Sequence, residues 1–306
     1  MTHKKSKVAI THNLDIGKAI QEALGHFNLK PLFRGKIVAL HPNDTLADEN
    51  DKTAVTQPDT LRAVLRCIKQ FEPRALVVTG GSGAGETDEI FRAAGLMDVI
   101  ESEGVEFHDH NRPPFKNVTL DYGRHPEVFG PQKSIKVNAR VLEYERLIAV
   151  NQLKVHETAT VTMALKNIAM SFPAADYYGH PRHAKKHKNY FFADMHSYIA
   201  AMAKTFPIDL AITVGHPAMI GLGPIGGHTV ETGLCIASAD PLAADVTGAF
   251  LLGFRTQAVR HLWEAAKLKL GGSDVDEFEF PALDIKKAFS IFTKAAYGKA
   301  IDPEHA

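Results

Sequence analysis

The apolar positions of this chain alternate between short continuous runs and longer stretches with a helical repeat. A continuous run such as residues 75–79, followed by glycines, is typical of a strand buried on both faces. By contrast, Leu61, Val64, Leu65 and Ile68 recur every three or four residues, which predicts a helix over about residues 59–71. Further strands are predicted at 8–10, 35–40, 147–150, 209–214 and 234–238, and further helices at about 15–25, 87–94, 158–169, 193–205, 256–268 and 284–296.

This alternation predicts an α/β protein, with mixed or parallel sheet layers and flanking helices. Residues 104–133 are rich in proline and poor in apolar pairs, which indicates a connector between two subdomains. We therefore expect an N-terminal α/β subdomain (residues 1–110), a connector (111–134) and a C-terminal α/β subdomain (135–306) that completes a central cleft.

The most polar segment beside a predicted strand is 151–158, which directly follows the strand at 147–150. It contains Lys154 and His156, and in open α/β sheets ligands bind where loops leave the carboxyl ends of strands. On the helix predicted to follow, Thr162 and Lys166 lie on a face away from the apolar stripe. That face is either a ligand contact or an ordinary surface row; we favour the ligand, because threonine is a mediocre helix former.

These residue types suggest roles at one site. Lys154 and Lys166 would clamp an anion, and His156 would move a proton, because the ordinary pKa of histidine lies near neutrality. Asn43 and Asn167 would orient the ligand. Turn chemistry is an equally good explanation of Asn43, which follows Pro42 at a strand end.

Two aspartates precede or begin the helix that starts at Pro241. Asp240 followed by Pro241 is a strong helix start, so we expect Asp240 to cap the helix rather than act in catalysis. Asp245 lies among alanines and valine, and a buried carboxylate is rarely unpaired. We expect Asp245 to pair with Lys154 or Lys166 and to be catalytic together with Lys154 and His156.

A glycine-rich loop, residues 80–87, stands between a strand and a helix. Its spacing nearly matches a phosphate-binding loop, but Glu86 stands where that motif has lysine, which argues against an ATPase. Gly81 and Ser82 remain candidates for binding an anion; the alternative is a tight turn in which Glu86 bonds the first amides of the helix. Three more candidates for ligand binding lie near predicted strand ends or glycine turns: Thr56, His216 and Gly223.

Metal binding receives less support. His183 and His187 have a spacing used for zinc, but Arg182 and three lysines surround them, and positive charge favours a basic flap over an anion instead. The sequence identifies no cofactor; a divalent metal is allowed but is not favoured.

Composition narrows the classes of function. Lys+Arg and Asp+Glu both number 35, which argues against a nucleic-acid binder but allows a small anionic ligand. With no apolar run of membrane-spanning length and no signal segment, we expect a cytoplasmic protein, for which a homo-oligomer is allowed. Two cysteines form neither a disulfide framework nor an iron–sulfur ligand set.

Several segments, taken in order, resemble the family known as domain of unknown function 362. The most specific is Lys154-x-His156 followed by Thr162 and Lys166-Asn167, and the next is the Asp240-Pro241 helix start. The resemblance covers about residues 8–253 and implies an α/β fold and candidate positions rather than a reaction. The chain departs from the family at His41, where lysine is common, and at Gly215, where an acidic residue is common.

Two hypotheses on function follow. The first is an enzyme that uses a Lys/His cleft on a small anionic or carbonyl substrate. The second is a non-catalytic accessory module that binds a metabolite or a metal and is linked to redox metabolism.

Overall fold

A nine-stranded mixed sheet forms the centre of the molecule. The structure, a computed structural model, describes residues 5–174 and 194–303. Seven strands lie in the order β1-β11-β9-β7-β2-β3-β4, and only β11 runs antiparallel to its neighbours in this series. The seven strands are β1 (Ala9–His12), β2 (Ile37–Pro42), β3 (Ala75–Gly80), β4 (Glu106–Asp109), β7 (Arg146–His156), β9 (Leu210–Ile220) and β11 (Leu234–Ser238).

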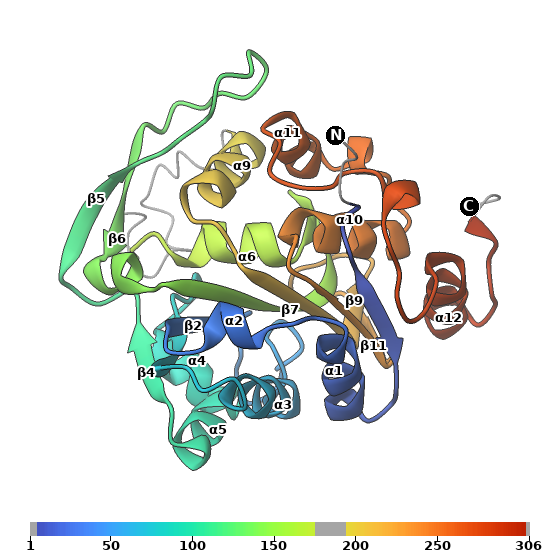
Figure 1. Cartoon of the computed structure of the whole chain (residues 1–306), viewed down its shortest axis with the longest axis horizontal. Coiled ribbons are helices and arrows are strands. Elements are labelled where there is room, and N and C mark those ends of the chain that lie inside the picture. The colour runs from blue at the N-terminus through green and yellow to red at the C-terminus, as the bar shows by residue number, and fades with distance from the viewer. Residues whose placement is uncertain (1–4, 175–193, 304–306) are drawn as a thin grey trace.

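Helices cover both faces of this sheet (Figure 1). Alternate residues of β7 enter two separate cores: Ile148 and Val150 pack on one side, and Ala149 and Leu153 on the other. The first core is closed by α1 (Ile16–Gly25), α2 (Lys30–Phe33), α3 (Pro58–Lys69), α4 (Thr87–Ala93) and α5 (Leu96–Glu103), and the second by α6 (Ala164–Ser171), α9 (Met195–Thr205), α10 (Pro241–Leu251), α11 (Arg260–Lys267) and α12 (Ile285–Tyr297). The predicted α/β class with flanking helices is confirmed.

The segment predicted as a connector contributes one strand to a separate two-stranded antiparallel sheet, whose second strand begins where the segment ends. The two strands are β5 (Phe115–Thr119) and β6 (Ser134–Asn138), which Figure 1 shows at one edge of the molecule. Strands on both sides of this segment join the single large sheet. The division into residues 1–110, 111–134 and 135–306 stays a prediction.

The structure corrects the region around residues 151–169. The predicted strand at 147–150 is too short, because β7 continues to His156 and then turns into β8 (Thr160–Thr162). Lys154 pairs with Thr162 across this hairpin, so these residues are extended and cannot begin a helix. Helix α6 begins only at Ala164, and the expected helical face shared by Thr162 and Lys166 does not exist.

The strand predicted at 209–214 is also too short. β9 continues through His216 and Pro217 to Ile220, where it pairs with β10 (His228–Val230). Between Gln152 and Lys154 the register of β7 against β9 shifts, and Lys154 lies opposite Met219. Both long strands therefore extend beyond Pro42, the last residue of β2. Lys154 and His156 lie on this extended part of β7.

Candidate functional site

Lys154 is enclosed where β7 passes beyond the end of β2. Its side chain is 1% exposed, and Nζ donates to the carbonyl of Ala54 at 2.9 Å and lies 3.5 Å from Oε1 of Gln152. Neither partner carries a charge, so burial lowers the pKa of Lys154 to about 7, with a further contribution from Lys166. Near neutral pH, about half of this amine is therefore uncharged and able to accept a proton or attack a carbonyl.

Lys166 lies in the first turn of α6 and is 8% exposed. Its ammonium makes neither a hydrogen bond nor an ion pair within the described residues, and burial lowers its pKa to about 8. A buried cation that has no partner among the described residues is costly, so Lys166 differs from the other buried polar groups of this region, which are hydrogen-bonded.

His156 has a fixed tautomer. Its Nδ1 accepts hydrogen bonds from the amides of Thr158 and Ala159 at 3.1 and 3.2 Å, so the proton of the neutral ring is on Nε2. Burial, followed by the nearby Lys166, Lys154 and His196, lowers its pKa to about 3. This pKa is well below the near-neutral value on which the expected proton transfer was based, and it leaves the ring neutral near pH 7, with Nε2–H as a hydrogen-bond donor.

Two further histidines complete what we call the basic cluster: Lys154, His156, Lys166, His196 and His261. Nδ1 of His261 lies 3.3 Å from Nδ1 of His196, and a ring N–H of His196 bonds the carbonyl of Thr158. Burial is the main cause that lowers the pKa of both rings. Sequence reasoning missed this pair, because the two residues are 65 positions apart on different helices and neither lies in a motif.

Asp245 holds the beginning of α6. Its two carboxylate oxygens accept hydrogen bonds from the amides of Ala164 and Leu165, both at 2.9 Å. Burial raises its pKa to about 7, against the effect of these two bonds. The expected pairing with Lys154 or Lys166 is wrong: in the described part of the chain, Asp245 forms no ion pair with either, and its geometry is that of a helix cap.

Asn43, Thr56 and Asn167 connect the strands around the cluster. Oδ1 of Asn43 accepts from the Gln152 amide at 2.8 Å, while the hydroxyl of Thr56 accepts from the Asn43 amide at 2.8 Å. Nδ2 of Asn167 donates to Oδ1 of Asn151 at 3.0 Å. These polar groups hold together the strands and loops beside Lys154.

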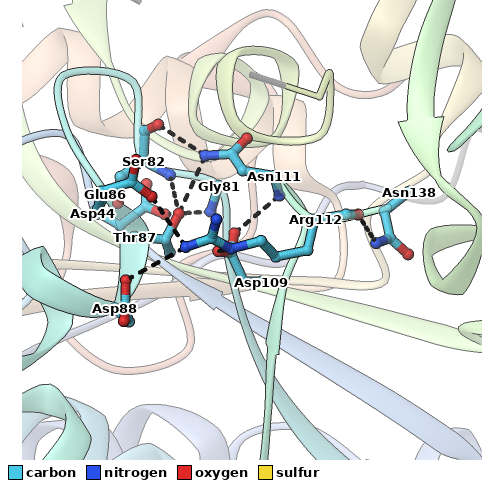
Figure 2. Close-up of polar contacts among 10 residues, drawn as sticks. All are labelled: Asp44, Gly81, Ser82, Glu86, Thr87, Asp88, Asp109, Asn111, Arg112 and Asn138. Atoms are coloured by element: carbon cyan, nitrogen blue, oxygen red, sulfur yellow. Dashed lines mark hydrogen bonds and ion pairs between the residues drawn. The ribbon is translucent and has the colours of Figure 1, made fainter. Parts of the chain in front are cut away.

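The glycine-rich loop is held by its own network (Figure 2). The amide of Gly81 donates to Asp44 Oδ2 at 2.6 Å, and a Cβ on Gly81 would lie 2.0 Å from the carbonyl oxygen of Ser171. Because Ser171 is the last residue of α6 and Lys166 lies in its first turn, the loop and the basic cluster adjoin opposite ends of that helix. The carbonyl of Ser82 accepts from Nδ2 of Asn111 at 3.1 Å.

The carboxylate of Glu86 has a different partner from the one expected. It forms an ion pair with Arg112 at 3.0 Å, and Arg112 also contacts Asp88 and Asp109 (Figure 2). Glu86 makes no side-chain cap of α4, so the predicted bond to the first amides of that helix is wrong. Three carboxylates around one guanidinium make this a poor place for an anion.

His216 and Gly223 lie in the β9 region and have structural partners. His216 contacts Asp59 Oδ2 through Nε2 and Glu231 Oε2 through Nδ1, both at 2.8 Å. The hydrogen bond to Asp59, followed by that to Glu231, raises the pKa of His216 to about 9. A Cβ on Gly223 would lie 2.2 Å from the carbonyl oxygen of Val155, so close packing explains this glycine.

The departures at His41 and Gly215 also have local explanations. His41 is buried, and its Nδ1 lies 2.9 Å from the hydroxyl of Thr79 on the neighbouring strand. A side chain on Gly215 would approach Oγ1 of Thr232 to 2.1 Å, so an acidic residue does not fit there without a shift.

The described residues show neither a metal-binding group nor a membrane-spanning helix. They hold no group of three or more histidine, cysteine, aspartate or glutamate side chains arranged to bind a metal ion. His183 and His187, and the flap expected around them, lie outside the described residues. None of the described helices combines the length and apolar composition that crossing a membrane requires.

A cavity of about 370 Å³ is lined by residues outside the basic cluster, among them Leu165, which directly precedes Lys166. Apolar residues dominate its lining, and the charged residues that reach it, Lys204 and Asp240, already have partners. Lys204 pairs with Asp121 at 3.4 Å, and Asp240 caps α10 as predicted from the sequence, accepting from Ala243 at 3.0 Å. No member of the basic cluster lines this cavity.

Comparisons with known proteins identify the fold. The model of the family described as "Domain of unknown function (DUF362)" matches residues 38–250. The lactate racemase apoprotein from Thermoanaerobacterium thermosaccharolyticum is similar in structure, with a TM-score of 0.50 and 14% identity over 79% of this chain and 56% of that one. A Thermotoga maritima protein gives a TM-score of 0.40 and 14% identity over 65% of this chain and 49% of its own.

The similarity to the lactate racemase apoprotein is one of fold alone. The chain spans about half the length of either structure. A search of curated proteins finds no match.

Proposed function

The chain belongs to the DUF362 family, and we propose that it is an enzyme that acts on a small anionic or carbonyl substrate in its basic cluster. The observation that carries the proposal is the buried Lys166 ammonium, which has no hydrogen bond or ion pair within residues 5–174 and 194–303. A protein keeps an unpaired buried cation at a cost in stability, and an anionic ligand offsets that cost.

The groups beside Lys166 support proton transfer next to a carbonyl. The neutral fraction of Lys154 acts as general base, because its lowered pKa leaves the amine free to accept a proton near pH 7. The Nε2–H of His156 donates to the substrate oxygen on which negative charge develops. Lys166 binds the anionic group of the substrate, and Asp245 acts as a positioning residue for the turn that carries Lys166.

The test is exchange of hydrogen for deuterium in heavy water, followed by proton NMR. Pyruvate, oxaloacetate and 2-oxoglutarate each carry exchangeable hydrogens next to a carbonyl. We expect the protein to accelerate exchange for at least one of them, and Lys154→Met to return the rate to that without protein. Lys204→Met is the matched control, since Lys204 is paired with Asp121 away from the cluster.

The alternative is an accessory module that holds a metabolite without turning it over. It predicts that one of the three acids binds and that its exchange rate stays at the uncatalysed value. Binding without accelerated exchange, together with loss of that binding in Lys166→Met, would contradict the enzyme proposal and support the accessory module.

A further inference from the structure

Two ammonium groups share the basic cluster, and neither has a carboxylate partner in the part of the chain that the structure describes. Lys154 bonds the neutral oxygen of Ala54, and the Lys166 ammonium has no bonding partner in the described chain. The two lysines are close enough that the charge on Lys166 acts on the Lys154 amine. Two like charges in one desolvated space repel each other more strongly than they would in water.

Among residues 5–174 and 194–303, the surroundings of the cluster do not supply the missing negative charge. Asp51 attracts Lys154 electrostatically but forms no ion pair with it among the described residues. Asp194, which lies near His196, is engaged by Arg260 at 2.9 Å. The histidines are neutral, so the cluster retains a deficit of two negative charges whenever both lysines are protonated.

We propose that the basic cluster binds a small ligand that carries two negative charges, such as a dicarboxylate or a phosphate monoester. The inference rests on the proposed function, in that it names the class of substrate for the same site. When both lysines are protonated, a dianion neutralises Lys154 and Lys166 together, whereas a monoanion leaves one ammonium buried and unpaired. The form of the complex in which Lys154 has lost its proton is the one in which this amine acts as the base. The Nε2–H of His156 adds an uncharged donor that suits an oxygen of either ligand.

Isothermal titration calorimetry at pH 8 and constant ionic strength tests the proposal. Malonate supplies two carboxylates, inorganic phosphate supplies one dianionic group, and acetate is the monoanion. We expect malonate or phosphate to bind about tenfold or more tightly than acetate, and the preferred dianion identifies which chemistry the site takes. Because lysines with pKa values of about 7 and 8 are partly neutral at pH 8, repetition in a second buffer should show uptake of about one proton per dianion.

Variants separate this inference from a general attraction of anions. Lys166→Met should weaken binding of the dianion about tenfold or more, so that the variant binds acetate and the dianion with equal affinity. Lys204→Met should bind as the natural protein does. Because methionine matches lysine in length without its charge, Lys166→Met should fold, and an unchanged or higher melting temperature would show this.

The outcomes distinguish the two proposals. Equal affinity for acetate and both dianions, or no binding of either dianion, would overturn the dianion inference, even where Lys154-dependent exchange establishes the enzyme. Tight binding of a dianion without exchange for any of the three acids would keep the inference and refute the enzyme.

Discussion

Asp245 accepts a hydrogen bond of 2.9 Å from the amide of Leu165, the residue directly before Lys166. A carboxylate from α10 thus fixes the turn of α6 that carries Lys166, whose ammonium has no partner among the described residues. The chemistry proposed for the cluster depends on this contact between residues 80 positions apart.

Replacing Asp245 should therefore affect both stability and the site. In Asp245→Asn, at least one of the two amides of α6 loses its acceptor or faces an NH2 group, which should lower the free energy of unfolding by about 1–3 kcal/mol. Urea denaturation measures the loss, and calorimetry with malonate should show weaker binding. Unchanged stability would mean that the carboxylate does not hold the helix.

The exchange rate should have a bell-shaped pH dependence. Exchange needs neutral Lys154 and protonated Lys166, so kcat/KM should rise as pH passes about 7 and fall as it passes about 8. Exchange rates measured by NMR between pH 5.5 and 9.5 should show both the rise and the fall. In Lys166→Met the fall at alkaline pH should be absent. A rate that rises steadily to pH 9.5 would argue against a role for the Lys166 charge.

His216 should stabilise the protein at low rather than high pH. Its folded pKa of about 9 is above the ordinary value of 6.5, so its contribution is fully present below pH 6.5 and is lost as pH rises through about 9. Asp59 and Glu231 are 59% and 45% exposed, so screening should keep the effect below about 1 kcal/mol.

The measurement is the difference in free energy of unfolding between the natural protein and His216→Gln. It should be larger at pH 6 than at pH 9.5 and should shrink in high salt. A difference that is independent of pH would mean that His216 is not charged in the folded protein.

Gly81 should be required for packing. A side-chain carbon at this position would overlap the backbone oxygen of Ser171, so Gly81→Ala should lower the free energy of unfolding by about 2 kcal/mol or more. Gly85→Ala is the matched control, because its Cβ would meet Ile90 at an ordinary 3.4 Å. Equal melting temperatures for the two variants would reopen a ligand role for Gly81.

Local pattern was enough to predict most of the fold. Helix α3, with Leu61 and Ile68 buried, and the Asp240 cap of α10 follow from spacing and capping rules that involve only neighbouring residues. The limits of β7 do not follow from such rules. Lys154 and His156 are polar and suggested a loop, whereas pairing with β8 and β9 makes them part of a strand.

The candidate site divides in the same way. The Lys154-x-His156 motif was enough to predict that these two members of the basic cluster lie close together. The position of Lys166 was not predictable in this way, because the start of α6 depends on a carboxylate about 80 positions away. The tautomer of His156 is set by amides that no pattern of residue types reveals. The pair of His196 and His261 requires the packing of α9 against α11, which is a property of the fold rather than of either segment.

The buried Lys166 also has a consequence for protein engineering. A library of variants screened only for resistance to heat would favour leucine or methionine at this position, because either residue removes an isolated charge from the interior. Such a screen would enrich thermostable variants that have lost the site. Directed evolution of this protein should therefore select for ligand binding as well as for stability in every round.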